Sequence, residues 1–206
     1  MLQFFVSFIL WALLHSLTAS RRVKAVVHRR VGDRIYTAWY RLFYNVFAFI
    51  TILPVFYILW TQVPTTVLWQ IPAPWAYGAV AVQAAGLLGL AASLWQTDVW
   101  EFVGLRQAWR YVRGEEELTL PPKLVTAGTY ALVRHPLYFF SMLLLWFNPV
   151  MTLNAFFFNL LATGYFWAGS RVEERRLADF FGEQYTQYRR RVPGLFPLPR
   201  PLKSED

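Results

Sequence analysis

The charged side chains of this 206-residue chain are confined to three segments, and that distribution limits the folds it can adopt. All 20 Lys and Arg and all 12 Asp and Glu fall within residues 19–41, 96–135 and 171–206. The stretches outside these segments are apolar and carry no charge. An uncharged apolar run of about 20 residues can cross a bilayer as a helix. The pattern therefore predicts an all-α, polytopic integral membrane bundle.

The composition agrees with this class and excludes others. Hydrophobic residues make up 56% of the chain, and 16% of residues are charged, compared with about 25% in typical soluble domains. The net charge of +8 comes from basic residues beside the apolar runs, where anionic lipid headgroups are the expected counter-charge. We expect no nucleic-acid partner. Because cysteine is absent, disulfides, thiolate nucleophiles and thiolate metal ligands are excluded.

The positions of the basic residues predict the topology. We expect five spans, the last two forming a hairpin about a turn at Asn148-Pro149: Leu2–Leu17, Leu42–Trp60, Trp75–Trp95, Leu137–Phe147 and Met151–Gly169. Basic loops favour the cytoplasmic side, so the N-terminus is expected outside and the C-terminus inside. A signal peptide is the alternative for the first span, and one kinked helix is the alternative for the hairpin. The basic cluster follows the first apolar run instead of preceding it, which argues against a signal peptide. A single kinked helix would place the basic tail outside the cell, which argues against that alternative.

The whole chain is expected to form a single membrane domain, 1–206. Residues 1–95 would be its three-helix N-terminal part, and residues 96–206 its functional core. We expect a bacterial-type cell membrane as the location, with the functional site on the cytoplasmic side.

The first arm of the predicted hairpin, Leu137–Phe147, is unusually short. It has 11 residues, which reach only about 16 Å at 1.5 Å per residue. Either the bilayer thins around it or the helix starts upstream, near Tyr130. Pro136 disfavours helical backbone at the preceding residue. We therefore expect a break near Pro136, of a kind that membranes tolerate where the backbone lines a cavity.

Polar side chains cluster around the start of this predicted helix. Residues 128–138 include Arg134, His135 and the tyrosines Tyr130 and Tyr138. Ionisable side chains near membrane depth usually face a bundle interior or an aqueous cavity, so they are functional candidates. The other two histidines, His15 and His28, lack carboxylates at ligand spacing. A metal site is therefore not expected.

The tail from Arg171 to Val192 has a helical pattern of its own. One apolar stripe is formed by Leu177, Phe180, Phe181, Tyr185 and Tyr188. We expect a cytoplasmic amphipathic helix that lies against the membrane or the bundle. Glu173 and Glu174 flank the stripe at the depth expected for Arg134 and His135. They are either half of a site or simply stabilise the helix dipole.

Four blocks occur in order along the second half of the chain: Gly128-x-Tyr130-x-x-Val133-Arg134-His135-Pro136-x-Tyr138, the apolar hairpin with Asn148-Pro149, Glu173-Glu174-x-x-Leu177, and Phe181-Gly182-x-x-Tyr185-x-x-Tyr188-x-x-Arg191-Val192-Pro193. This arrangement resembles the isoprenylcysteine carboxyl methyltransferase family of membrane enzymes, over about residues 100–197. Two further motifs resemble the bacterial branch that contains methanethiol S-methyltransferases and NnrU-type proteins: Phe102-Val103-Gly104-Leu105-Arg106-Gln107, and His15-Ser16 followed by Arg21 and Lys24.

The resemblance implies a methyltransferase that uses S-adenosylmethionine, bound on the cytoplasmic side, with an acceptor that can arrive from the lipid. Arg134 and His135 would hold the carboxylate of the donor. Glu173 or Glu174 would hold its ribose hydroxyls or its ammonium. The donor-binding residues that the resemblance implies are Tyr130, Arg134, His135, Pro136, Tyr138, Glu173 and Glu174.

Methyl transfer from a sulfonium depends on in-line placement of the acceptor and on exclusion of water. If the acceptor is a thiol, the thiolate is the reactive form. A nearby cation favours that form, and Arg106 and Arg134 are the catalytic candidates. His135 is a conceivable general base, but it is equally suited to holding the donor.

Two functions remain open at this level. The first is a membrane methyltransferase whose acceptor is a small thiol or another lipophilic nucleophile, such as a prenylated cysteine or a phospholipid amine. The second is a non-catalytic NnrU-like membrane protein associated with nitrogen-oxide metabolism. The polar blocks favour the enzyme, and the short chain favours a small acceptor.

Overall fold

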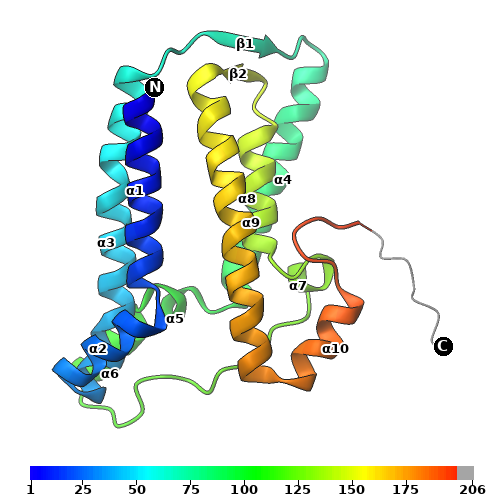
Figure 1. The fold of residues 1–206 in the computed structure, drawn as a ribbon. Helices are drawn as coiled ribbons and strands as arrows, with labels where there is room; N and C mark the ends of the chain where they lie inside the picture. Colours follow the sequence, from blue (N-terminus) through cyan, green and yellow to red (C-terminus); the bar gives the residue numbers. More distant parts are fainter. Residues whose placement is uncertain (199–206) are drawn as a thin grey trace. The chain divides into compact units, whose positions relative to one another are not determined.

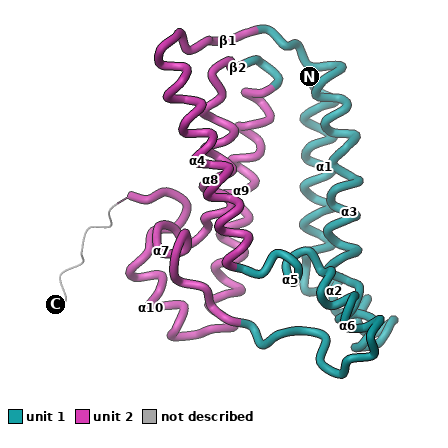
Figure 2. Tube along the Cα trace, turned by 180° about the vertical axis from the view of Figure 1, so that it is seen from behind, with its two compact units in different colours: residues 1–66, 97–122, 152–154 teal, residues 67–96, 123–151, 155–206 magenta. Residues whose placement is uncertain are grey.

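The computed structural model describes residues 1–198, which are helical apart from one two-stranded sheet and the connecting loops (Figure 1). The chain divides into two compact units, each assembled from segments far apart in the sequence (Figure 2). Unit 1 comprises residues 1–66, 97–122 and 152–154, and unit 2 comprises residues 67–96, 123–151 and 155–206. Each unit has its own packed helices.

Unit 1 is built on two antiparallel helices, α1 (Leu2–Thr18) and α3 (Asp33–Gln62), which lie side by side (Figure 1). Between them in sequence is α2 (Arg21–Val31), which begins after Ser20, whose hydroxyl accepts a hydrogen bond from the backbone N–H of Val23 at 3.3 Å. The His15 side chain of α1 bonds the Tyr44 hydroxyl of α3 at 2.6 Å. This histidine is thus a polar link between neighbouring helices.

Two short helices of unit 1, α5 (Val99–Val103) and α6 (Leu105–Val112), pack against α3. Gly104 joins them with φ +97°, a left-handed conformation that favours glycine. A Cβ at this position would also lie 2.5 Å from the backbone nitrogen of Leu42. Asn45 of α3 donates a hydrogen bond to the Val103 carbonyl at 2.9 Å. These contacts hold the junction of α5 and α6, next to Arg106 in the first turn of α6, against α3.

Unit 2 is built around α4 (Trp75–Gln96) and α8 (Pro136–Trp146), which pack closely. Glycines in α4 allow this approach: a Cβ on Gly86 would lie 3.1 Å from the Phe140 carbonyl, and one on Gly89 would overlap the Phe140 ring. The amide of Gln83 in α4 donates to the Leu144 carbonyl at 2.8 Å. Small residues thus bring these two apolar helices together.

Three further helices and a small sheet complete unit 2, except that residues 152–154, where β2 meets α9, are grouped with unit 1. The helices are α7 (Thr129–Leu132), α9 (Leu153–Phe181) and α10 (Glu183–Arg191), and the sheet pairs β1 (Val67–Gln70) with β2 (Val150–Thr152). The amide of Asn159 in α9 donates to the Leu145 carbonyl of α8 at 2.7 Å. The Asn148-Pro149 turn falls between α8 and α9, as predicted.

Two of the described helices, α3 and α4, are long and apolar enough to cross a membrane. A third candidate is the pair α1 and α2, which is bent by 54°. The first arm of the predicted hairpin is the 11-residue helix α8, too short to qualify. A mostly helical membrane protein is therefore confirmed, whereas the count of five spans stays a prediction.

Two details of the sequence-based prediction are wrong. The pattern predicts one tail helix from Arg171 to Val192, but α9 continues through Arg171 to Phe181, and a separate helix, α10, follows Gly182. The reason is that the stretch after Gly169 contains no helix breaker until Gly182, which adopts φ +55°. The chain is also not purely α-helical, because part of the predicted outer loop 61–74 forms β1.

The packing of α4 on α8 yields a stability prediction. Gly89→Ala should destabilise the protein by about 1–3 kcal/mol, because the added methyl group overlaps the Phe140 ring. Gly78→Ala in the same helix is the matched control, since nothing lies within 4 Å of a Cβ there. Thermal unfolding in detergent measures both. Equal midpoints for the two variants would show that the α4–α8 contact is looser than described.

Candidate functional site

The polar site of unit 2 starts from a break between α7 and α8. Val133 is extended, with φ −144° and ψ 152°, and Pro136 is the first residue of α8. Proline fits this first helical position because its missing N–H has no partner there anyway. The expected break near Pro136 is confirmed. It leaves the backbone N–H groups of Arg134 and His135 outside any helix.

Those two N–H groups bind the segment that follows α10. The Arg134 N–H donates to the carbonyls of Pro193 and Gly194, at 2.9 and 3.1 Å, and the His135 N–H donates to Gly194 at 3.4 Å. A Cβ on Gly194 would lie 3.4 Å from Nη2 of Arg134. The tail after α10 is therefore attached to the break mainly through its backbone.

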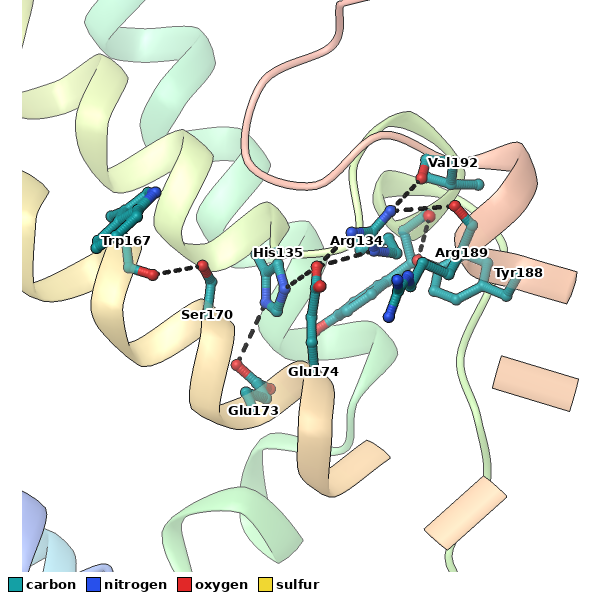
Figure 3. Close-up of polar contacts among 10 residues, drawn as sticks. Arg134, His135, Trp167, Ser170, Glu173, Glu174, Tyr188, Arg189 and Val192 are labelled. Atoms are coloured by element: carbon teal, nitrogen blue, oxygen red, sulfur yellow. Dashed lines mark hydrogen bonds and ion pairs between the residues drawn. The ribbon is translucent and has the colours of Figure 1, made fainter. Parts of the chain in front are cut away.

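The Arg134 side chain is buried, with 4% of its surface exposed, and all of its nitrogens have partners (Figure 3). Nη1 donates to the carbonyls of Val192 at 2.6 Å and Arg189 at 3.2 Å. Nε donates to Oε1 of Glu174 at 3.1 Å, and Nη2 forms an ion pair with the same oxygen. A buried cation requires such a counter-charge. Arg134 thereby joins α9 to the end of α10.

The His135 ring lies between two carboxylates (Figure 3). Its Nε2 is 3.2 Å from Oε1 of Glu174, and its Nδ1 is 3.3 Å from Oε2 of Glu173. Tyr138, in the first turn of α8, stacks on His135 with ring centroids 5.6 Å apart. Phe166 of α9 also stacks on Tyr138, with ring centroids 5.1 Å apart. The polar cluster thus continues into an aromatic stack.

The charges of the cluster shift one another's proton affinity. Burial alone would lower the pKa of His135, but its hydrogen bonds to Glu173 and Glu174 outweigh burial and raise that pKa above 6.5. Burial would raise the pKa of Glu174, yet hydrogen bonds from His135 and Arg134 lower it to about 2. Glu174 is therefore ionised at neutral pH, and protonation of His135 is favoured.

Two tyrosines of α10, Tyr185 and Tyr188, are buried near Arg134. The Tyr188 hydroxyl donates to the Tyr130 carbonyl at 2.6 Å and so links α10 to α7. The Tyr185 ring is fully buried, and within residues 1–198 its hydroxyl has no hydrogen-bond partner. Burial, together with the charge of Glu174, raises the pKa of Tyr185 to about 12. This hydroxyl is thus a neutral donor available beside the cluster.

The α7 end of the site is attached to α4. The N–H and hydroxyl of Thr129 both contact Oε1 of Gln96, at 3.1 and 2.8 Å, and the hydroxyl lies 3.0 Å from that of Ser93. Gly128, with φ +62°, packs directly on the Gln96 amide. Sequence reasoning missed Gln96 and Ser93, because single polar residues near a helix end carry no recognisable pattern.

The structure brings most of the sequence-predicted residues together. Arg134, His135, Glu173 and Glu174 are in direct contact, Pro136 sets the break, and Tyr138 covers His135. Tyr130 contributes its carbonyl to Tyr188. Arg106 belongs to unit 1, where it pairs with Asp98 at 2.7 Å and lies 4.0 Å from Glu101. Its catalytic role, like donor binding by the cluster, stays a prediction.

The tail carbonyls are the main addition to the predicted site. Sequence reasoning included Arg191-Val192-Pro193 only as part of a motif, whereas Val192, Pro193 and Gly194 supply acceptors to the break. The Pro193-Gly194 pair is a turn signal that could have indicated irregular backbone here. Nothing local to the tail indicates which residues it contacts.

Comparison with known proteins identifies the relatives of this chain. It is 34% identical over 192 residues to "Methanethiol S-methyltransferase 1" of Bradyrhizobium diazoefficiens, covering 93% of this chain and 65% of that protein. It is 33% identical over 194 residues to the methanethiol S-methyltransferase of Mycobacterium tuberculosis, covering 92% of this chain and 75% of that protein. A shorter match, 44% identical over 81 residues, links it to the protein-S-isoprenylcysteine O-methyltransferase of Schizosaccharomyces pombe, covering 36% of this chain and 33% of that protein.

These similarities place the chain in the isoprenylcysteine carboxyl methyltransferase-like superfamily of membrane methyltransferases. Within it, the chain belongs to the methanethiol S-methyltransferase family. It spans 65% and 52% of the lengths of the two Bradyrhizobium diazoefficiens relatives. No family model and no solved structure matches the chain. The NnrU-like alternative is not favoured, because these relatives carry methyltransferase names.

The buried ion pair of Arg134 and Glu174 yields a stability prediction. Glu174→Gln should destabilise the protein by about 3–5 kcal/mol, because it leaves the Arg134 guanidinium buried without a counter-charge. Glu173→Gln is the matched control; its side chain is 48% exposed, so the loss should be about 1 kcal/mol or less. Denaturant or thermal unfolding in detergent separates the two. Similar losses in both variants would contradict the assignment of Glu174 as the principal counter-charge.

The raised pKa of His135 predicts a pH dependence. Protonated His135 contributes its full stabilisation below pH 6.5, and this contribution is lost as the pH rises through the higher folded-state pKa. The unfolding midpoint of the wild type should therefore fall on the alkaline side of 6.5 more steeply than that of His135→Gln. Parallel pH profiles for the two proteins would show that His135 is not held in its charged form.

Proposed function

We propose that this chain is an integral membrane methyltransferase that uses S-adenosylmethionine to methylate a small thiol. The observation that carries the proposal is the similarity to methanethiol S-methyltransferases over more than nine tenths of the chain. The buried cluster of Arg134, His135 and Glu174 supports it, since it combines a cation and a carboxylate near the start of an apolar helix. The shorter match to isoprenylcysteine enzymes keeps larger lipophilic acceptors as the second possibility.

The topology we propose has five spans, with the N-terminus outside and the C-terminus and the site cytoplasmic. The three charged segments support it, because each would then lie on the cytoplasmic side. The apolar part of α9 would be the last span, and its charged end would project from the membrane. We propose α10 as a cytoplasmic amphipathic helix: Tyr185 and Tyr188 are buried, whereas its arginines are exposed.

The residues of the site fit the chemistry of the donor. Bound there, S-adenosylmethionine would supply a methyl group on a positively charged sulfur. Glu173 is the more exposed carboxylate of the pair and is suited to the ammonium or the ribose hydroxyls. The Tyr185 hydroxyl, buried without a partner within the described chain, is a donor for an oxygen of the ligand. The proposed donor site also includes His135, Tyr138, Pro136 and Tyr130.

Arg134 has a more indirect part in this proposal than the sequence alone implies. All of its nitrogens already bind Glu174 or tail carbonyls. We therefore propose that Arg134 positions Glu174 and the tail, and adds positive potential for the carboxylate of the donor. A positive potential also favours a thiolate acceptor. Arg106, about one third exposed in unit 1, is the second candidate for that effect.

The chemistry itself requires little acid–base machinery. Rigid aromatic and apolar walls hold the reactants in line, which converts a bimolecular step into a unimolecular one. Exclusion of water leaves the thiolate poorly solvated and therefore reactive. The ring of His135, closed on both sides by Glu173 and Glu174, is committed to the cluster, so we assign no general base.

Ligand binding and turnover test the proposal together. Calorimetry on purified protein should detect binding of S-adenosylhomocysteine, and His135→Ala and Glu174→Ala should each weaken it by about tenfold or more, as expected when charge-assisted contacts are lost. Glu183→Ala, an exposed carboxylate at the start of α10, is the matched control and should bind as the wild type does. Thermal unfolding verifies that each variant is folded.

The acceptor is tested with methyl-labelled donor and a panel of methanethiol, prenylcysteine analogues and ethanolamine lipids. Methylation of the thiol in preference to the others is the expected result. Absence of S-adenosylhomocysteine binding would refute the enzyme assignment. Binding with methylation of prenylcysteine alone would retain the reaction class and overturn the small-thiol acceptor.

A further inference from the structure

The segment after Tyr188 combines exposed cations with exposed apolar side chains. We refer to residues 189–198 as the tail segment. Its first three residues, Arg189, Arg190 and Arg191, form the last turn of α10. Arg190 and Arg191 are exposed, and within residues 1–198 neither forms an ion pair. Arg190 and Arg191 therefore place a concentrated positive charge at the end of α10.

The apolar part of the tail segment follows at once. The side chains of Phe196 and Leu198 are 49% and 68% exposed, on a stretch without helix or strand. Large apolar side chains left in water forgo the free energy that burial would supply. Cations next to protruding Phe and Leu are the pattern of segments that lie in a membrane interface, where one part meets headgroups and the other meets acyl chains.

The fold brings this segment back to the apolar helices of unit 2. The chain reverses at Gly182, and α10 runs back along the end of α9, so that the tail segment returns to the level of α7 and the start of α8 (Figure 1). Its carbonyls at Val192, Pro193 and Gly194 bind Arg134 and His135 there. The tail segment therefore reaches the start of the apolar helix α8 and contacts Arg134 and His135 directly.

We propose that the tail segment docks on a surface of anionic phospholipid, and that this docking strengthens its hydrogen bonds across Arg134 and His135. The positive charge of the segment selects anionic over neutral headgroups, and Phe196 and Leu198 insert among the acyl chains. The Arg134 guanidinium binds both the tail carbonyls and Glu174. Docking of the tail segment on lipid therefore also orders the cluster of Arg134, His135 and Glu174. Anionic lipid would thereby tighten donor binding, a consequence that rests on the proposed function.

A protein partner is the competing occupant of such a surface. Charge favours the lipid: the three arginines carry no compensating acid within the tail segment. Attraction of basic residues to anionic membranes is worth about fivefold in affinity for each residue near the surface. It also weakens at high salt, because charges beyond a Debye length of about 10 Å at 0.1 M salt are screened.

The absence of cysteine makes a direct test available. Leu198→Cys introduces a unique thiol that can carry an environment-sensitive fluorophore, and Gln184→Cys, exposed on the first turn of α10, is the matched control. The full chain is reconstituted in nanodiscs of phosphatidylcholine, with and without phosphatidylglycerol. We expect blue-shifted emission from position 198 with phosphatidylglycerol, reversal by salt, and no change at position 184.

Arginine variants connect the shift to charge. Arg190→Gln with Arg191→Gln should raise the phosphatidylglycerol fraction needed for the shift by severalfold, whereas Arg113→Gln, an exposed arginine of unit 1, should not. Emission at position 198 that is identical in both lipids would overturn the proposal, and a blue shift that persists in both lipids and at high salt would indicate a protein contact instead. The proposal would also be overturned if the two arginine changes have no effect on the emission at position 198.

Calorimetry in the same nanodiscs examines the link to the site. Phosphatidylglycerol should lower the dissociation constant of S-adenosylhomocysteine severalfold in the wild type, and not in the double arginine variant. An unchanged dissociation constant together with an intact fluorescence shift would overturn the coupling and retain the docking. Absence of S-adenosylhomocysteine binding in every lipid would refute the proposed function, while the fluorescence result would still decide the docking.

Discussion

The contact on which the rest of the site depends is the buried pair of Arg134 and Glu174. A guanidinium with 4% of its surface exposed is tolerated only if it has a counter-charge and a full set of acceptors. Glu174 supplies the charge from α9, and the carbonyls of Arg189 and Val192 supply the remaining acceptors. One side chain therefore holds together the break before α8, the end of α9 and the end of α10. No apolar contact at that place could set the three segments with the same directionality.

The second carboxylate and the imidazole extend this arrangement. His135 lies between Glu173 and Glu174, and the lowered pKa of Glu174 and the raised pKa of His135 both follow from their hydrogen bonds. The cluster is thus a set of fixed charges beside an aromatic stack of His135, Tyr138 and Phe166. Such preorganisation is what a methyl transfer needs, since the reaction gains more from fixed geometry than from proton transfer. Membership of the methanethiol S-methyltransferase family and the cluster chemistry therefore point in the same direction.

Backbone geometry supports the site as much as side-chain chemistry does. Pro136 ends the helical path and frees two N–H groups, which the tail then satisfies. Gly89 lets α8 approach α4, because a Cβ there would overlap the Phe140 ring. Gln96 and Thr129 attach α7 to α4 by two hydrogen bonds. Pro136 is effective because it has no N–H to donate and Gly89 because it has no side chain, whereas Gln96 and Thr129 act through their polar groups.

The helical membrane class, the ranges of α1 and α4 to within one residue, the break at Pro136 and the set of charged residues that meet could all be predicted from the amino-acid sequence, whereas α3 begins at Asp33, well before the predicted span at Leu42. The correct predictions follow from local rules: hydropathy, charge exclusion from hydrocarbon and proline geometry. The sequence predicted the tail incorrectly as one helix, because the stripe of Leu177, Phe181 and Tyr185 continues across the break at Gly182. Three features became visible only in the folded protein: Glu174 and tail carbonyls bind all the nitrogens of Arg134, the Tyr185 hydroxyl has no hydrogen-bond partner within the described residues, and Gln96 binds Thr129. Those contacts join residues more than 30 positions apart, and their partners depend on how helices pack, which no local pattern encodes.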